Sequence, residues 1–170
     1  MSQQYLFLLM GPKGSGKTHI GSLIDKNFPN HIKFIRVENV WLNLKPGENG
    51  WQKVEEFVDD SFKSCQKSIM IESLGIGPDF PLFFQSLNSK YCIKLIKIQC
   101  NDLDVCASRV KSRDLAVHVP VSDEKLAMYN CLASKVEMKW DLVIDNTVPL
   151  QDEAIVEKFK IIVQDLMIQN

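Results

Sequence analysis

Residues 11–18 of the 170-residue chain carry three glycines, two lysines and a threonine in the order Gly-Pro-Lys-Gly-Ser-Gly-Lys-Thr. This order matches G-x-x-x-x-G-K-[ST], a loop whose main-chain amides can converge on phosphate groups. Glycines permit the backbone torsions that turn successive N–H groups inward, and a helix that follows the loop presents its positive end to the same point. The sequence therefore predicts a site for a nucleotide's phosphates that begins at Gly11.

We expect the loop residues and their neighbour to contact the nucleotide: Gly11, Pro12, Lys13, Gly14, Ser15, Gly16, Lys17, Thr18 and His19. Lys17 would reach the β- and γ-phosphates as a compact charge, and Thr18 would give its hydroxyl to Mg²⁺. Lys13 either adds positive charge there or extends into water, and His19 is expected on a helix surface. The alternative is a glycine-rich turn that carries lysine and threonine by coincidence.

Two carboxylates could complete such a site. Glu72 ends the apolar run "SIMIE", where a carboxylate can hold the metal ion directly or through water, or contact the substrate; it could also face solvent. Glu38 and Arg36 lie two residues apart at the end of another expected strand, so they share a face. They form an ordinary ion pair, or Glu38 orients or deprotonates an attacking hydroxyl while Arg36 binds an anionic substrate group.

Arg109 and Arg113 are four residues apart in "CASRVKSRD", on one face of a predicted helix. A segment of weaker periodicity follows, so residues 109–124 are predicted to form a closing lid. Lid arginines can stabilise the charge that spreads over the oxygens of a transferring phosphoryl group, while closure excludes water. The alternative is a solvated basic helix face. His118, in the same segment, is either a substrate contact or an ordinary loop residue.

The elements that must position these residues follow from the apolar pattern. Short apolar runs alternate with segments of helical periodicity, which is typical of a parallel sheet covered by helices on both faces. The predicted strands are Tyr5–Met10, Lys33–Val37, Ser68–Ile71, Ile93–Gln99 and Leu142–Ile144. We expect one α/β domain over residues 1–170, folded as a three-layer α/β/α sandwich.

Three helices are predicted from spacing and capping residues. Apolar residues recur every three or four positions from Trp51 to Phe62, which predicts that Trp51 lies in the core; the alternative is that Trp51 stacks on a ligand. Asn101 is the predicted N-cap of the helix that carries Arg109. A third helix, after Gln151, is expected to cover the sheet with one apolar face.

The composition limits the kinds of partner, cysteine chemistry and location that we expect. The net charge of −1 gives no overall basic field, which argues against a nucleic-acid partner. The five cysteines are odd in number and never spaced as C-x-x-C, which predicts reduced core thiols rather than a disulfide framework or a zinc site. No apolar run reaches the length of a membrane span, so no membrane association is expected and the cytoplasm is the predicted location.

The phosphate loop, the segment "IKLIKIQCNDLDVCASRVKSRD" and "WDLVIDNT" before a helix together resemble the small P-loop kinases. These include nucleoside monophosphate, shikimate and gluconate kinases, and the group of zeta-toxin and polynucleotide kinase relatives. The resemblance implies a five-stranded parallel sheet in the order 2-3-1-4-5, ATP with Mg²⁺ as phosphoryl donor, and a small acceptor under the lid.

The resemblance also implies roles for individual residues. Asn146 and Thr147 would lie beside the adenine, Arg109 would contact adenine or phosphate, and Arg113 would be the catalytic lid arginine, although the two arginines could exchange roles. Lys17 and Glu38 would complete the catalytic set. Three departures weaken any named acceptor: Glu38 stands where an aspartate is common, the D-G-x-x-R motif is absent, and "ESLGIG" replaces the glycine triplet of shikimate kinases.

The sequence thus predicts an ATP-dependent kinase that transfers the γ-phosphate to a small metabolite or nucleotide. Two alternatives remain open: a polynucleotide 5′-kinase, which would need a basic channel, and a nucleotide-binding module or slow NTPase that acts as a switch. The expected partners are the nucleotide and a small-molecule acceptor, and the expected assembly is a monomer or homodimer.

Overall fold

The computed structural model describes residues 4–113 and 118–167. Within these ranges the chain forms five strands and seven helices. Of the predicted lid segment 109–124, residues 114–117 lie outside the description. No helix in the described ranges is long and apolar enough to cross a membrane.

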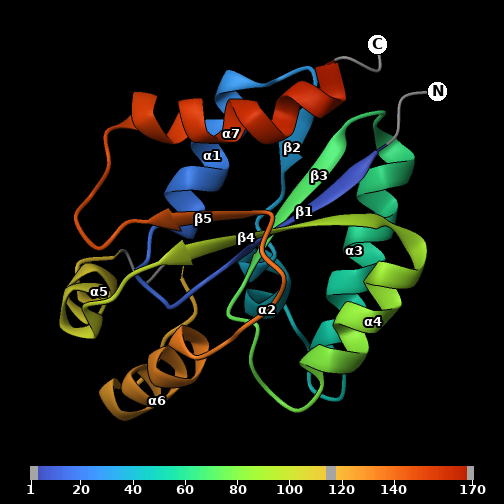
Figure 1. Cartoon of the computed structure of the whole chain (residues 1–170). Helices are drawn as coiled ribbons and strands as arrows, with labels where there is room; N and C mark the ends of the chain where they lie inside the picture. Colours follow the sequence, from blue (N-terminus) through green and yellow to red (C-terminus); the bar gives the residue numbers. More distant parts are fainter. Residues whose placement is uncertain (1–3, 114–117, 168–170) are drawn as a thin grey trace.

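All five strands pair in parallel in one sheet (Figure 1). In chain order they are β1 (Tyr5–Met10), β2 (Ile32–Phe34), β3 (Ser68–Ser73), β4 (Cys92–Gln99) and β5 (Leu142–Asp145). The spatial order is β2-β3-β1-β4-β5, which confirms the expected topology. Strand β1 is central, since Leu6 lies opposite Ile69 of β3 and Ile93 of β4. Its carboxyl end, where the phosphate loop begins, therefore lies between two other strand ends.

Helices cover both faces of the sheet, as predicted. Figure 1 shows α1 (Lys17–Asn27) and α7 (Asp152–Met167) together on one face, and α3 (Gly50–Ser64) and α4 (Phe80–Lys90) on the other. Three more helices, α2 (Glu38–Leu42), α5 (Leu103–Lys111) and α6 (Asp123–Ser134), complete the chain. Helices α5 and α6 lie at the edge where β4 and β5 end.

Strand β1 supplies both hydrophobic layers because its successive side chains point to opposite faces. Phe7 packs with Phe159 of α7 in one layer, and Leu8 packs with Val58 of α3 in the other. Every residue of β1 is buried. This burial on both faces explains why the strand reads as an unbroken apolar run.

Strand β2 is shorter than predicted, and this changes the position of Glu38. The prediction was Lys33–Val37, but the strand ends at Phe34 and α2 begins at Glu38. Val37 already has helical torsions, φ −65° and ψ −21°. Ile35 and Val37 are nevertheless buried, although they lie in a turn after the strand. Their apolar side chains made the predicted strand too long at this end.

Two further expectations need correction near β4. The N-cap of α5 is Asp102 rather than Asn101, because the Asp102 carboxylate accepts hydrogen bonds from the amides of Asp104 and Val105. The sulfur atoms of Cys100 and Cys106 are paired in a disulfide, so these two residues are not the free thiols that were predicted. The first turns of α5 bring Cys106 back to the end of β4. Of the other cysteines, Cys92 is exposed.

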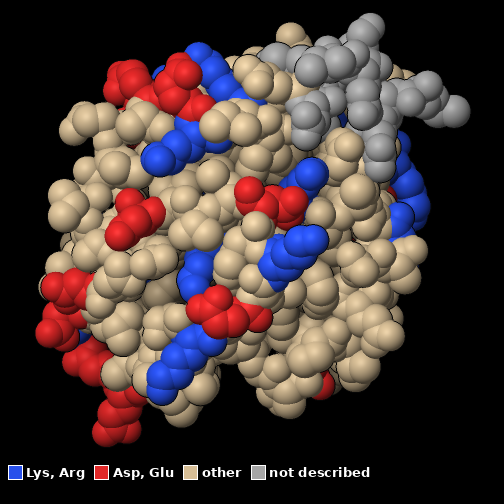
Figure 2. Space-filling view, viewed as in Figure 1, with Lys and Arg blue, Asp and Glu red and all other residues tan. Residues whose placement is uncertain are grey.

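Charges of both signs are interspersed on the face of the molecule in Figure 2. On the described part of that face, Lys and Arg side chains lie beside Asp and Glu side chains and form no continuous basic band. That nucleic acid is not a partner remains a prediction.

Candidate active site

The phosphate loop joins β1 to α1 and contains the backbone conformations for which glycine is suited. Gly14 has φ +86° and Gly16 has φ +100°. A Cβ atom at Gly14 would lie 2.1 Å from the carbonyl oxygen of Cys106, so α5 packs directly against the loop. Gly16 is the N-cap of α1 and supplies no side-chain cap, which leaves the first amides of the helix available to an anion.

Lys17 is the buried cation of the loop, with 8% of its surface exposed. Its Nζ donates to the carbonyl oxygens of Gly11 and Pro12, both at 2.8 Å. Burial, more than any other influence, lowers the pKa of Lys17 to about 8; Glu72 opposes this shift and Arg113 adds to it. The loop thus holds a buried ammonium group whose hydrogen-bond acceptors, the two carbonyl oxygens, carry no formal charge.

Thr18 and Glu72 are 54 residues apart in sequence but in direct contact. The Thr18 hydroxyl donates to Glu72 Oε2 at 2.8 Å. Glu72 lies within β3, one residue before its end, and opposite Leu9 of β1. Because the hydroxyl hydrogen points to Glu72, the lone pairs of its oxygen are directed elsewhere and can face a metal ion.

Glu38 is in direct contact with the predicted lid segment. Its Oε1 accepts a hydrogen bond from the amide of Val119 at 2.9 Å, and its Oε2 lies 2.9 Å from His118 Nδ1 and 3.6 Å from Arg36. Burial alone would raise the pKa of Glu38, but the bonds from Val119 and His118 together hold it below its usual value. Glu38 is therefore ionised at neutral pH, with acceptor capacity left over.

Lys13 and Arg113 place two more cations near Lys17. The Lys13 backbone is held by Asn130 of α6, whose side chain accepts from Lys13 N at 2.8 Å and donates to Lys13 O at 3.0 Å. Burial lowers the pKa of the Lys13 side chain, and the charge of Arg113 contributes to this lowering. The Lys13 side chain is half-buried, so it does not extend freely into water; that it adds positive charge near a nucleotide remains a prediction.

Arg109 binds main-chain carbonyl groups from two loops. Its guanidinium donates to Gly14 O at 3.2 Å, to Asn146 O at 3.0 and 3.1 Å, and to Thr147 O at 2.9 Å. Asn146 is buried, and its side chain donates to Ser15 O at 2.8 Å. Arg109 and Asn146 therefore join the phosphate loop to the turn after β5. Contact of these residues and Thr147 with an adenine remains a prediction.

A cavity of about 280 Å³ brings most of the predicted catalytic residues together. Its described lining includes the following predicted residues: Lys13, Lys17, Thr18, Glu38, Glu72 and Arg113. Arg36 contacts Glu38 but does not line this cavity. His19 also lies outside the lining, with its exposed ring 2.8 Å from Asp152.

Sequence reasoning missed the aromatic wall of the same cavity. Trp41, Trp51 and Phe83 line it, whereas the sequence offered only Trp51, as a core residue with ligand stacking as the alternative. Trp51 does pack against core residues, with its ring centroid 4.7 Å from that of Phe83. Helical periodicity reports which face of a helix is apolar, but it does not show whether that face meets another helix or a ligand.

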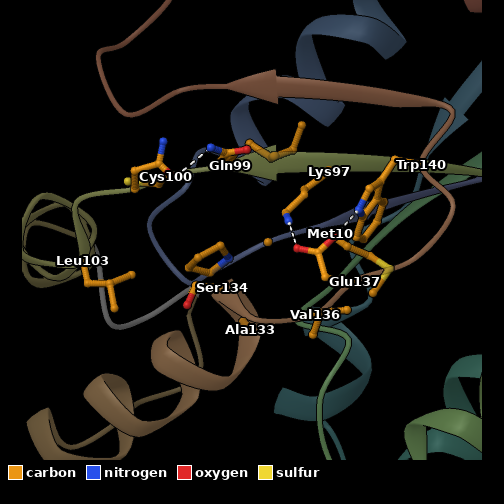
Figure 3. A pocket seen from close by; sticks show the side chains of 14 residues that line it. Met10, Lys97, Gln99, Cys100, Leu103, Ala133, Ser134, Val136, Glu137 and Trp140 are labelled. Atoms are coloured by element: carbon orange, nitrogen blue, oxygen red, sulfur yellow. Dashed lines mark hydrogen bonds and ion pairs between the residues drawn. The ribbon is translucent and has the colours of Figure 1, made fainter.

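A second cavity, of about 450 Å³, lies beside the start of the phosphate loop (Figure 3). It is bordered by the end of β4 and by residues after α6, where Lys97 binds Glu137 at 2.9 Å next to Trp140. None of the predicted catalytic side chains lines it in the described structure. Although larger, this cavity is not the one in which the predicted chemistry could take place.

The loop fits a nucleotide's phosphates and a magnesium ion. Besides the free first amides of α1 and the buried ammonium of Lys17, the Ser15 hydroxyl is fully buried without a hydrogen-bond partner among the described residues. Thr18 and Glu72 supply oxygen atoms, which Mg²⁺ prefers, and Mg²⁺ completes its shell with water and phosphate oxygens. No group of three or more His, Cys, Asp or Glu residues in the described ranges could form an all-protein metal site.

Comparison with known proteins identifies the fold. No protein-family model matches the sequence, and no curated protein sequence matches it. Solved structures do match over nearly their whole length. A gluconokinase from Sinorhizobium meliloti has a TM-score of 0.60 and 13% identity, with 100% of this chain and 99% of that chain covered.

Two other solved structures give the same result. The APS kinase of Mycobacterium tuberculosis, in complex with AMPPNP and APS, has a TM-score of 0.61 and 9% identity over 98% of this chain and 99% of that one. A shikimate kinase from Acinetobacter baumannii, in complex with shikimate, has a TM-score of 0.57 and 16% identity over 96% of both. The chain thus has the fold of the small P-loop kinases.

Proposed function

We propose that this protein is an ATP-dependent kinase that phosphorylates a hydroxyl group of a small molecule. The observation that carries the proposal is the single cavity that joins Lys17 and Thr18 of the phosphate loop to Glu38 and Arg113. Phosphate-binding groups and a half-buried, ionised carboxylate thus share one space. The kinase fold of the solved structures supports this reading.

Each side chain has a role in the transfer. The amides of the loop and Lys17 hold the phosphates of ATP, and Glu38 accepts a hydrogen bond from the acceptor's hydroxyl. Glu38 takes the hydroxyl proton as the acceptor oxygen bonds to the γ-phosphorus and the bond from that phosphorus to the bridging oxygen breaks. Arg113 and Lys13 stabilise negative charge on the transferring group.

Thr18 and Glu72 would hold the metal side of the site. Mg²⁺, when bound, neutralises charge on the phosphate oxygens. Glu72 orients the Thr18 hydroxyl so that its lone pairs are available to the ion. His118 and Val119 hold the Glu38 carboxylate in place, and through them the lid segment contacts the acceptor side.

A substitution of Glu38 tests this function. The change Glu38→Gln keeps the shape of the side chain but removes its charge, so we expect kcat to fall about 10²- to 10⁴-fold, while the Kd for MgADP stays within about threefold. Acceptor-dependent ADP release, with a panel of alcohols, and calorimetry of ADP binding measure the two quantities.

The control is Glu56→Gln, which alters an exposed carboxylate paired with Lys53 and should change neither quantity. Release of ADP at the same rate with and without every acceptor would contradict the kinase and favour the NTPase or switch. An unchanged kcat in Glu38→Gln would remove Glu38 from the mechanism.

A further inference from the structure

The acceptor end of the cavity is walled mainly by apolar side chains. Nine of the sixteen described lining residues are apolar, and Trp41, Trp51 and Phe83 form an aromatic group among them. Ile76 and Val119 add further apolar surface. An acceptor covered with hydroxyl groups would lose its hydrogen bonds to water against such walls, whereas a flat ring would bury favourable area.

The aromatic wall is held rigidly. The rings of Trp41 and Trp51 meet edge to face, with centroids 5.3 Å apart and an angle of 85°. A Cβ atom at Gly50 would lie 1.9 Å from the Trp41 ring, so this ring packs directly on the start of α3. Both indoles are half-buried, which leaves part of each accessible. A rigid aromatic surface of this kind favours planar ligands because little side-chain freedom is lost on binding.

The cavity also contains charged side chains. Its described cations are Lys13, Lys17 and Arg113, and the proposed function assigns all three to the phosphates. Arg113 lowers the pKa of both lysines and Glu38 raises it. On the acceptor side, the Glu38 carboxylate lines the cavity, and the Arg36 guanidinium, 3.6 Å from it, is already paired with that carboxylate. An acceptor with its own phosphate or carboxylate would place that anion near Glu38 or against apolar walls, at a cost in free energy.

We propose that the acceptor is an uncharged alcohol with a planar ring system, the chemical class to which nucleosides belong, and that its ring lies against Trp41 and Trp51. This inference rests on the proposed kinase function and names its substrate class. The acceptor's hydroxyl oxygen gains the γ-phosphoryl group, Glu38 takes the proton, and ADP leaves with the electrons of the broken bond. The cavity of about 280 Å³ lies at the lower end of ligand-pocket volumes, which suits one small ring compound.

The experiment compares acceptors that differ in one feature. The panel contains five nucleosides and pyridoxine as uncharged ring alcohols, the nucleoside 5′-monophosphates as charged counterparts, and ribose, gluconate and shikimate as compounds without an aromatic ring. We expect the best ring alcohol to exceed its charged counterpart at least about tenfold in kcat/KM, and ribose at least about 100-fold. ADP release with MgATP measures kcat/KM.

Tryptophan fluorescence gives a second readout that needs no turnover. The chain has three tryptophans, and Trp140 borders the other cavity, so Trp140→Phe leaves Trp41 and Trp51 as the reporters. Ring alcohols should quench this protein saturably, and gluconate and shikimate should not.

The variant Trp51→Leu should lower kcat/KM for ring alcohols about 10- to 100-fold, with the Kd for MgADP unchanged. Phe62→Leu is the matched control, because Phe62 stacks on Tyr91 with centroids 4.2 Å apart and does not line the cavity. Circular dichroism and thermal melting verify that both variants fold. If Trp51→Leu does not fold, the milder Trp51→Phe, with an expected loss of about threefold or more, takes its place.

The outcomes separate this inference from the proposed function. If MgATP binds and a sugar acid, a sugar or a monophosphate is the best acceptor, the substrate class is wrong and the kinase stands. If MgATP binds but no ring alcohol quenches fluorescence or accelerates ADP release, the substrate class is also wrong. If MgATP does not bind to the folded protein, the proposed function itself fails.

Discussion

Lys17 carries its charge where water has little access, and this should make the proposed phosphate binding sensitive to pH. Among the described residues, the groups within hydrogen-bond distance of its Nζ are the neutral carbonyl oxygens of Gly11 and Pro12. Burial and the neighbouring Arg113 both disfavour the protonated form of Lys17. The negative charge of phosphate groups bound at the loop would favour that form again.

We therefore expect ADP binding to take up a proton near pH 9. With a pKa of about 8, the free protein has mostly neutral Lys17 at that pH, and bound phosphates raise the pKa so that the proton returns. Affinity should fall as pH rises above about 8, by up to tenfold per pH unit. Calorimetry in buffers of different ionisation enthalpy measures the uptake.

Lys17→Arg, which stays charged throughout, is the control for this proton and should show no such uptake. Proton-neutral binding by the unchanged protein at pH 9 would show that Lys17 remains charged in the free site.

We expect Arg113 to have a different role from Lys17, because it lies within the predicted lid segment as well as in the cavity. We expect Arg113→Ala to slow turnover about 10- to 1000-fold while ADP binds with a similar Kd, since a lid arginine acts chiefly on charge that develops during transfer. Single-turnover kinetics and ADP titration measure the two effects.

Lys111→Ala is the companion variant to Arg113→Ala. Lys111 forms an exposed ion pair with Asp123, so its loss should leave both values unchanged. Equal turnover in Arg113→Ala and Lys111→Ala would remove Arg113 from catalysis.

At the scale of the elements, the close packing of α5 against the phosphate loop explains why Gly14 must be glycine. Gly14 and Gly47 both have φ +86°, but a Cβ at Gly47 would meet no described atom within 4 Å, whereas at Gly14 it would meet Cys106 O at 2.1 Å. Alanine substitutions at these two glycines therefore separate the loss of stability caused by the positive φ from the loss caused by the contact with α5.

We expect Gly47→Ala to lower the free energy of unfolding by about 1–2 kcal/mol, the cost of a left-handed residue with a side chain. Gly14→Ala should cost roughly 1–3 kcal/mol more because α5 must move, and it should weaken ADP binding at least about tenfold. Urea unfolding and ADP titration measure these effects. Equal losses of stability in the two variants would show that α5 moves away from the loop at little cost in free energy.

Sequence patterns located the strands and the phosphate loop well, because they depend on local physics. Five apolar runs became five strands, and the glycine spacing marked the turn from β1 into α1. The end of β2 was misplaced because burial of Ile35 and Val37 does not require a strand. Contacts between distant residues left no local signal, as the bonds from Asn130 to Lys13 and from Arg109 to three carbonyl groups show.

At the scale of the whole molecule, one hydrophobic layer links the helix after the phosphate loop, α1, to α7. Phe159 of α7 is fully buried in the same cluster as Ile20 of α1 and Phe7 of β1. The helix that follows the phosphate loop is therefore supported by a segment about 140 residues later in the chain.

We expect Phe159→Ala to lower the free energy of unfolding by about 3–5 kcal/mol, through lost burial and the cavity left behind. Ile161→Ala, on the exposed side of the same helix, should stay within about 0.5 kcal/mol of the unchanged protein. Chemical denaturation monitored by circular dichroism gives both values. A small loss in Phe159→Ala would mean that α7 contributes little to the layer that supports α1.

The position of α7 also has a consequence for synthesis of the protein. The amino end of a new chain leaves the ribosome first. Strand β1 and the phosphate loop therefore emerge from the exit tunnel long before residues 152–163, which complete the hydrophobic layer beneath them. A nascent chain halted before α7 would leave Ile20 and Phe7 with an open side. Affinity for nucleotides should therefore arise late in translation, when α7 has left the exit tunnel.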